Sequence, residues 1–356
     1  MNRLFLFGMT LSFLTMTACN NDDDSPSSDP TPTGDYVNGV LIVNEGGFGA
    51  ANASVGFIGE NGVYQPEIFK NVNGENLGDV AQSIYTHEDK AYIVLNGSGT
   101  VEVVNRYTFE KEGTISSGLA NPRYVIIENN KAYVSNWGDP TNPDDDYLAV
   151  VNLNSLTVES TISVVEGPEK MTSKNGKVFV AHMGGWGYGN SVSVINTSNN
   201  TVSANLSTAD VPHGIFEENN YLYVLCSGKA AWTGDETQGG LYVFDISTNN
   251  LIFNHSFATG VHPSHLEKDN GTLYYTIDDK VFSADFNALN LPTVPLFSLS
   301  DQGVYGVYGF AVNNGKIYVA DAGDYVSNGK IFVYSSDSGD LTSYSVGLLP
   351  NSFGFN

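Results

Sequence analysis

The sequence is poor in cysteine, in basic residues and in charge of any kind. Its 356 residues include two cysteines, Cys19 and Cys226, too few for a disulfide framework if Cys19 has another role. Charged residues make up 15% of the chain, which argues against long solvated helices. The 15 Lys and Arg face 39 Asp and Glu, and the formal net charge of −24 would repel a phosphate backbone. We therefore expect no nucleic-acid partner, and solubility explains the charge.

The first 35 residues predict export rather than a folded domain. Residues 1–18 have Arg3, an apolar run and then small residues, which is typical of a secretory signal peptide. The four residues ending at Cys19 resemble a bacterial lipobox, which implies lipidation of Cys19. Residues 19–35 are polar and proline-rich and predict a flexible tether. The acidic run at 22–24 resembles the signal that sends Bacteroidetes lipoproteins to the outer face of the outer membrane, and an ordinary acidic linker is the alternative.

An internal repeat is the strongest pattern in the remaining chain. Six similar segments, such as "RYVIIENNKAYVS" and "YGFAVNNGKIYVA", recur every 41 to 51 residues. An aromatic residue follows the first residue of each segment by ten positions. These aromatics are Tyr92, Tyr133, Phe179, Tyr223, Tyr274 and Tyr318. Glycine and aromatic residues are abundant, with 38 Gly, 20 Tyr and 19 Phe, as suits short strands joined by tight turns.

The repeat predicts an all-β, seven-bladed propeller over residues 36–356. Each segment is typical of a strand, an Asn/Asp/Gly turn and a second strand, followed by two more strands, and the period matches a four-stranded blade. A seventh copy starts at Asn351 and ends after one strand, while residues 36–46 supply a turn and a second strand. We therefore expect the C-terminal strand to pair into the first blade, which closes the ring and removes free edges.

The first positions of the repeats form a predicted ring around the propeller axis, because equivalent residues of all blades lie on one rim. Five of the seven follow a proline, and proline turns that merely place the inner strand are one interpretation. A purely structural position should keep its residue, however, and these seven differ, which favours a ring adapted to a ligand. The ring residues are Gln82, Arg123, Glu169, His213, Ser264, Tyr308 and Asn351.

The loops between the second and third strands of the blades lie on the same rim and carry large aromatic side chains. "AHMGGWGYGNS" (181–191) is one of them, too glycine-rich for a helix or a flat strand. All three tryptophans of the chain lie in these loops, with Phe48, Tyr188 and Tyr325. Exposed aromatics on a rigid frame indicate a binding surface. Packing of the rings against one another over the blades is the alternative.

Signals of catalysis or metal binding are weak. His213, His262 and His265 lack the spacing of a metal motif, and we expect His262 to cap a turn. Asp144–Asp146 could hold calcium but lack the spacing of a calcium loop, so solvation is the simpler interpretation. Cys226 ends an apolar strand and is expected to be buried rather than nucleophilic. We find no nucleotide or nucleophile motif and predict neither an enzyme, a resident cofactor nor a metal site.

The stretch "VLIVNEGGFGAANASVGFI" (40–58), with the lipobox, the acidic tether and the blades, resembles Bacteroidetes surface lipoproteins of the cobalamin-capture (BtuG-like) type. This resemblance implies an outer-membrane, lipid-anchored propeller facing the cell exterior. It would capture cobalamin or another corrinoid as a carried ligand and pass it to a TonB-dependent transporter. Asn52, Arg123, His213 and Asn351 would bond the amide fringe, and His213 or His265 would be able to ligate the cobalt. The expected contacts are Phe48, Asn52, Gln82, Arg123, Trp137, Trp186, Tyr188, His213, Trp232, His265, Tyr308 and Asn351.

Two other classes of protein remain open from the sequence. A glycan- or protein-binding propeller would also use aromatic loops. A lactonase-like or other hydrolase propeller would place clustered carboxylates around an axial calcium, and Glu169 is the single acid among the seven ring residues.

Overall fold

The computed structural model describes residues 31–286 and 290–356. The predicted signal peptide, the lipidation at Cys19 and most of the predicted tether lie outside this described part. Residues from Thr33 to Asn356 form one compact unit.

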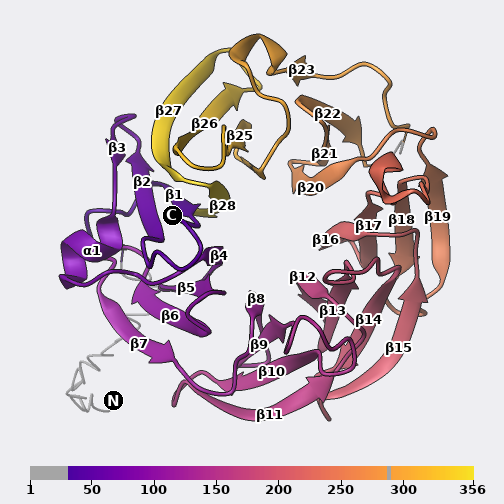
Figure 1. The fold of residues 1–356 in the computed structure, drawn as a ribbon, viewed down its shortest axis with the longest axis horizontal. Helices are drawn as coiled ribbons and strands as arrows, with labels where there is room; N and C mark the ends of the chain where they lie inside the picture. The colour runs from indigo at the N-terminus through magenta and orange to yellow at the C-terminus, as the bar shows by residue number, and fades with distance from the viewer. Residues whose placement is uncertain (1–30, 287–289) are drawn as a thin grey trace, which may run out of the picture. The chain divides into compact units, whose positions relative to one another are not determined.

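This unit consists of seven four-stranded antiparallel sheets arranged as the blades of a propeller (Figure 1). Blade 1 contains β28 (Pro350–Phe355), β1 (Gly39–Asn44), β2 (Ser54–Gly59) and β3 (Tyr64–Gln65), from the axis outward, and is followed by α1 (Ile68–Asn73). Blade 2 contains β4 (Ala81–His87), β5 (Lys90–Leu95), β6 (Thr100–Asn105) and β7 (Lys111–Ile115). Blade 3 contains β8 (Pro122–Glu128), β9 (Lys131–Asn136), β10 (Tyr147–Asn152) and β11 (Thr157–Ser163). Blade 4 contains β12 (Pro168–Lys174), β13 (Lys177–His182), β14 (Ser191–Asn196) and β15 (Thr201–Ser207).

The remaining three blades follow the same order. Blade 5 contains β16 (Pro212–Glu218), β17 (Tyr221–Cys226), β18 (Gly240–Asp245) and β19 (Leu251–Ser256), with the short helix η1 (Ala231–Thr233) in its β17–β18 loop. Blade 6 contains β20 (Ser264–Asp269), β21 (Thr272–Ile277), β22 (Lys280–Asp285) and β23 (Phe297–Ser298). After η2 (Ser300–Gln302), blade 7 contains β24 (Gly309–Asn313), β25 (Lys316–Asp321), β26 (Asn328–Ser335) and β27 (Leu341–Leu348). The predicted fold class and blade count are confirmed.

The ring is closed by the C-terminal strand, as the sequence predicts. β28 pairs antiparallel with β1, with Val40 opposite Phe355 and Ile42 opposite Phe353. The closure is reinforced from blade 2, where Arg106 Nε donates to Asn356 Oδ1 over 2.8 Å. Strand β1 therefore has a partner on both sides, and blade 1 combines the two ends of the described unit (Figure 1).

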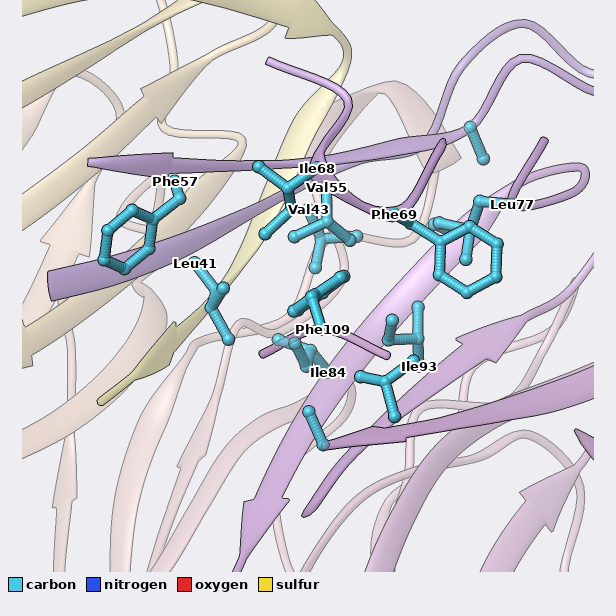
Figure 2. Packing of buried hydrophobic residues seen from close by; sticks show 14 of the residues in the cluster. Leu41, Val43, Val55, Phe57, Ile68, Phe69, Leu77, Ile84, Ile93 and Phe109 are labelled. Carbon is cyan, nitrogen blue, oxygen red and sulfur yellow. The ribbon is translucent and has the colours of Figure 1, made fainter. Parts of the chain in front are cut away.

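The core lies within and between neighbouring blades. All six repeated aromatics lie on the second strand of their blade and are buried, so the repeat marks a packing position. Figure 2 shows how the cluster shared by blades 1 and 2 extends under α1, where Ile68 and Phe69 pack beside Val55 and Phe109. Burial on this scale stabilises each large side chain by roughly 1.5–3 kcal/mol and holds the blades at fixed angles.

The order of strands determines which loops share a face. In each blade the first strand starts at one face of the propeller and runs to the other. The antiparallel second strand returns to the starting face, where a loop connects it to the third strand. The starts of the inner strands and the loops between second and third strands therefore lie on the same face. We call it the upper face.

Candidate functional site

The ring residues are placed by a backbone arrangement that recurs in five blades. Two positions before each of these ring residues, the backbone is left-handed, at Val80, Asn121, Gly167, Val211 and Leu349, with φ from 50° to 67°. Proline or alanine follows, and then the strand register shifts, so that extra residues bulge from the inner strand. A left-handed β-branched residue such as Val80 is strained by about 1–3 kcal/mol. Such strain persists only where the surrounding fold enforces it.

The same arrangement ties the ring to the loops of the upper face. The carbonyl oxygen of each left-handed residue accepts a hydrogen bond from the first backbone N–H of the loop that follows the second strand. In blade 5, Ser227 N donates to Val211 O over 2.8 Å, and in blade 4, Met183 N donates to Gly167 O over 2.9 Å. Each of these ring residues is thus anchored to the loop of its own blade.

A cavity of about 800 Å³ occupies the centre of the propeller, and all seven ring residues line it, together with His265. The prediction that these residues form one ring is therefore correct in its geometry. The bulges also turn a second residue toward the cavity. In blade 3 both Arg123 and Tyr124 oppose Ser135, and in blade 4 both Glu169 and Lys170 oppose Ala181.

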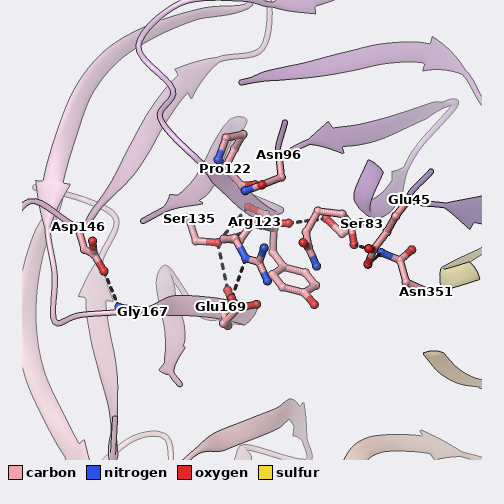
Figure 3. A network of polar contacts seen from close by, with 12 residues as sticks. Glu45, Ser83, Asn96, Pro122, Arg123, Ser135, Asp146, Gly167, Glu169 and Asn351 are labelled. Carbon is pink, nitrogen blue, oxygen red and sulfur yellow. Dashed lines mark hydrogen bonds and ion pairs between the residues drawn. The ribbon is translucent and has the colours of Figure 1, made fainter. Parts of the chain in front are cut away.

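One wall of the cavity is built around the ion pair of Arg123 and Glu169 (Figure 3). Arg123 Nε donates to Glu169 Oε1 over 2.7 Å, and the guanidinium lies 4.1 Å from the ring centroid of Trp137. Burial raises the pKa of Glu169, and the positive charge of Arg123 opposes that rise. Arg123 is therefore occupied on two sides, by a carboxylate and by an indole.

A second polar group spans the closure of the ring. Glu45 accepts hydrogen bonds from Tyr308 Oη over 3.0 Å and from Asn351 Nδ2 over 2.8 Å. The amide nitrogen of Asn351 also donates to the carbonyl oxygens of Ala81 and Gln82. Burial raises the pKa of Glu45, while these hydrogen bonds lower it. Asn351 Oδ1 remains buried without a partner in the described part of the chain.

The opposite wall contains two histidines and an ion pair that joins blades 4 and 6. Lys170 Nζ lies 3.7 Å from Glu267 Oε1, and His213 and His265 contact each other edge to face, with ring centroids 5.3 Å apart. His265 Nδ1 lies 3.0 Å from Thr276 Oγ1. Burial lowers the pKa of His213 to about 4, with a smaller effect from Lys170. Burial also lowers the pKa of His265 well below its usual value. Both imidazoles are therefore neutral at neutral pH.

Exposed aromatic side chains lie on loops of the upper face, outside the lining of the central cavity. Phe48, Trp186 and Trp232 are 89%, 78% and 83% exposed. Tyr188 and Tyr325 are also exposed, as is Tyr305 at the start of blade 7, which the sequence analysis missed. These side chains come from the loops of blades 1, 4, 5 and 7 and are called the rim aromatics. Tyr325 contacts the ring residue Tyr308 edge to face, with ring centroids 5.7 Å apart. Trp186 and Trp232 stay exposed, which argues against a purely structural role for these two indoles.

Trp137 is the exception among the predicted loop aromatics. It is half-buried beneath Arg123 rather than free on the face, so the expectation of three exposed indoles is wrong for this one. It still lines a small cleft together with Trp186, and the loops of blades 3 and 4 therefore meet. The side-chain oxygen of Asn52 accepts a hydrogen bond from Gly47 N within its own loop.

The remaining candidates have structural roles. His262 binds the carbonyl of Ser227 and lies 3.3 Å from Glu236, in keeping with the predicted turn cap. Cys226 is buried, and burial raises the pKa of its thiol to about 12. Asp146 is not a solvated member of an acidic loop. It is buried, it accepts a hydrogen bond from Gly167 N over 2.5 Å, and burial raises its pKa to about 6.

Comparison with known proteins agrees with this architecture. The model of a family described as a domain of unknown function, DUF5074, matches residues 38–313. The chain belongs to the DUF5074 family. No curated protein matches it.

Solved propeller structures resemble this DUF5074 member in fold at low sequence identity. Hydrazine synthase of Kuenenia stuttgartiensis has 16% identity and a TM-score of 0.60, over 76% of this chain and 88% of that chain. AztD of Citrobacter koseri has 12% identity and a TM-score of 0.53, over 88% and 96% of the two chains. BamB of Moraxella catarrhalis has 14% identity and a TM-score of 0.50, over 87% and 84%. At such identities the likeness concerns the fold alone.

Within residues 31–286 and 290–356, no group of three or more His, Cys, Asp or Glu is arranged to hold a metal ion. No helix in this part is long and apolar enough to cross a bilayer.

Proposed function

We propose that this protein captures cobalamin or another corrinoid on its upper face. The observation that carries the proposal is the combination of a polar central cavity with exposed aromatic side chains on loops of the same face. Trp186, Trp232 and Phe48 come from three separate blades and leave their ring faces to solvent. A large ligand with a flat face and a polar fringe is suited to such a surface.

The charge inside the cavity favours a ligand that is neutral at its contact points. Arg123 is paired with Glu169, and Lys170 lies near Glu267, so neither cation is free for an anionic group. Asn351 Oδ1 is buried without a partner in the described chain, and an amide N–H of the ligand would satisfy it. The amide side chains of a corrinoid offer such donors.

The rigidity of the site supports tight capture. Ordering a loop on binding costs affinity, and here the ring residues are fixed by bulges and left-handed turns before any ligand arrives. The aromatic loops are bonded to the same turns. The site is therefore largely preorganised.

Anchoring and transfer belong to the proposal as its cellular context. The predicted lipidation of Cys19 would hold the protein in the outer membrane, with the tether extending the propeller outward. A TonB-dependent transporter would receive the ligand, and no catalysis is needed for this role. Labelling of cells with a radioactive fatty acid should mark the wild-type protein and leave Cys19→Ala unlabelled.

Calorimetric titration with cyanocobalamin tests the capture itself. Wild-type protein should bind, and the double variant W186A/W232A should bind at least about tenfold more weakly, because aromatic anchors dominate such interfaces. Both indoles are exposed, so the double variant should melt within about 2 °C of wild type. Ile252→Ala on the outer strand β19 is the matched control, since it also removes an exposed apolar side chain.

Two results would contradict the proposal. Absence of binding at micromolar concentrations of protein and cyanocobalamin would rule out corrinoid capture. Binding to a glycan array by the same protein would then favour a glycan-binding propeller, since exposed indoles also stack on sugar rings.

A further inference from the structure

His213 occupies a distinctive place in the site. It is the extra residue of the β16 bulge, between Pro212 and Gly214. The β17–β18 loop of its own blade carries Trp232, and the β13–β14 loop of the preceding blade carries Trp186. His213 lines the central cavity, and these two loops lie on the same face, in blades 4 and 5.

The imidazole of His213 is fixed in place but has no hydrogen-bond partner. Nδ1 is buried and has no partner among the described residues. His182 also has a buried Nδ1 without a partner, but its Nε2 lies 2.8 Å from Ser193 Oγ, and His265 Nδ1 lies 3.0 Å from Thr276 Oγ1. The edge contact with His265 holds the ring of His213 against the wall. A buried polar group without a partner is costly, so a ligand atom that bonds it relieves that penalty.

The surroundings of His213 keep it unprotonated. The titratable groups that face it are Lys170 from blade 4 and His265 and Glu267 from blade 6. With a pKa of about 4, the imidazole is neutral at pH 5 and above. A neutral imidazole is a common ligand of transition metals and needs no loss of a proton to bind.

We propose that His213 coordinates the cobalt of the captured corrinoid directly. This inference rests on the proposed function and adds the way in which the metal centre is recognised. The step is a ligand exchange: the bond from cobalt to a bound water breaks, a bond from cobalt to an imidazole nitrogen forms, and the water leaves. The oxidation state of cobalt is unchanged, and no proton is transferred.

A comparison of two corrinoids distinguishes coordination of the cobalt from binding of the ligand as a whole. Aquacobalamin has an exchangeable water on cobalt, whereas cyanide blocks that position in cyanocobalamin. The visible absorbance of aquacobalamin should change when it binds to wild-type protein, and that of cyanocobalamin should not. His213→Gln should lose the change and bind aquacobalamin at least about tenfold more weakly. Far-UV circular dichroism and a melting temperature like that of wild type show that the variant is folded.

Surface histidines provide the control. His87 lies at the far end of β4 and is partly exposed. His87→Gln should keep the full absorbance change. The change should also be the same at pH 5 and pH 7, because His213 stays neutral over that range, whereas coordination by an ordinary histidine would weaken below its pKa of about 6.5.

The outcomes separate the two proposals. If aquacobalamin binds without an absorbance change, or if His213→Gln retains the change, the coordination is refuted and the capture stands. If neither corrinoid binds to the wild-type protein, the proposed function fails and the coordination fails with it.

Discussion

Replacing Arg123 by methionine should destabilise the propeller strongly, because it leaves the Glu169 carboxylate buried without its cation. The Glu169 side chain is 7% exposed and that of Arg123 is 16% exposed. Removing one partner of a buried ion pair costs about 3–5 kcal/mol. Methionine keeps part of the packing on Trp137, so we expect a loss near the lower value, about 3 kcal/mol at pH 7.

The double variant R123M/E169Q should recover most of this loss. With both charges removed, no uncompensated carboxylate remains, and replacing a buried pair by neutral groups is often close to neutral in stability. Urea denaturation followed by far-UV circular dichroism should therefore give a coupling free energy of about 2–3 kcal/mol between the two positions. Lys131→Met is the control, because Lys131 and Glu159 form an exposed pair whose loss should cost less than about 1 kcal/mol.

The pH dependence offers a second measurement on the same variant. In R123M the pKa of Glu169 rises further above its unfolded value, so the penalty is present at high pH and is relieved as pH falls through the folded-state pKa. The deficit of R123M relative to wild type should therefore shrink between pH 7 and pH 5. If R123M/E169Q is as unstable as R123M, or if the deficit is independent of pH, the unpaired carboxylate is not the cause.

Three further predictions concern the frame of the site. Gly167→Ala should cost more than about 2 kcal/mol, because a Cβ there would lie 2.0 Å from the backbone nitrogen of Gly185, whereas Gly323→Ala, also at positive φ but with open space around it, should cost about 1 kcal/mol on denaturation in urea. A chain that ends at Leu349 should lose its cooperative melting or associate through the free edge of β1, as size-exclusion chromatography would reveal; a stable monomer would argue against ring closure as a source of stability. The pKa of His182 is lowered to about 4 by burial, so the unfolded chain takes up a proton below pH 6.5 while the folded chain does not, and stability is lost as pH falls from 6.5 toward 4. By pH 5 this loss reaches up to about 2 kcal/mol, and His182→Gln should have a flatter profile; an unchanged profile would assign the acid sensitivity to other groups.

The fold was accessible from the sequence because its signal is local and repeated. An aromatic ten residues after each blade start is a packing requirement, and each of the six is buried on a second strand. The ring of cavity-lining residues could be predicted from the sequence for the same reason, since proline and the bulge recur at one position of the repeat. Closure by the C-terminal strand followed from an incomplete copy at each end of residues 36–356.

Other parts of the site were not accessible, because they depend on contacts between blades. Glu45 lies outside the repeated ring position and joins the cavity through Tyr308 and Asn351, which are more than 250 residues away in the sequence. Lys170 enters through a bulge that turns two adjacent side chains the same way, contrary to simple strand alternation. The bulge itself offered a signal in hindsight, since a proline at the start of five of the seven inner strands marks where alternation fails.

Trp137 and Trp186 illustrate the limit most clearly, because both begin from equivalent loops in neighbouring blades. Trp137 lies on the cavity wall, 4.1 Å from the guanidinium of Arg123 in its own blade, whereas Trp186 is 78% exposed. Such a contact between a loop and a ring residue is not visible in the repeat pattern of the sequence.

The same coupling links closure of the propeller to the state of its site. The left-handed backbone at Val80, Val211 and Leu349 is strained, and nothing in the local sequence offsets that conformational free energy. The carbonyl oxygens of these residues accept hydrogen bonds from the loops of the upper face. An open sheet would relax these turns, because nothing would force the bulges into register. Loosening β28 should therefore disturb loops in blades that it does not touch, and hydrogen exchange at the amide of Ser227 should rise when the C-terminal strand is weakened by Phe353→Ala. Unchanged exchange at Ser227 would mean that each blade holds its own turn without the closed ring.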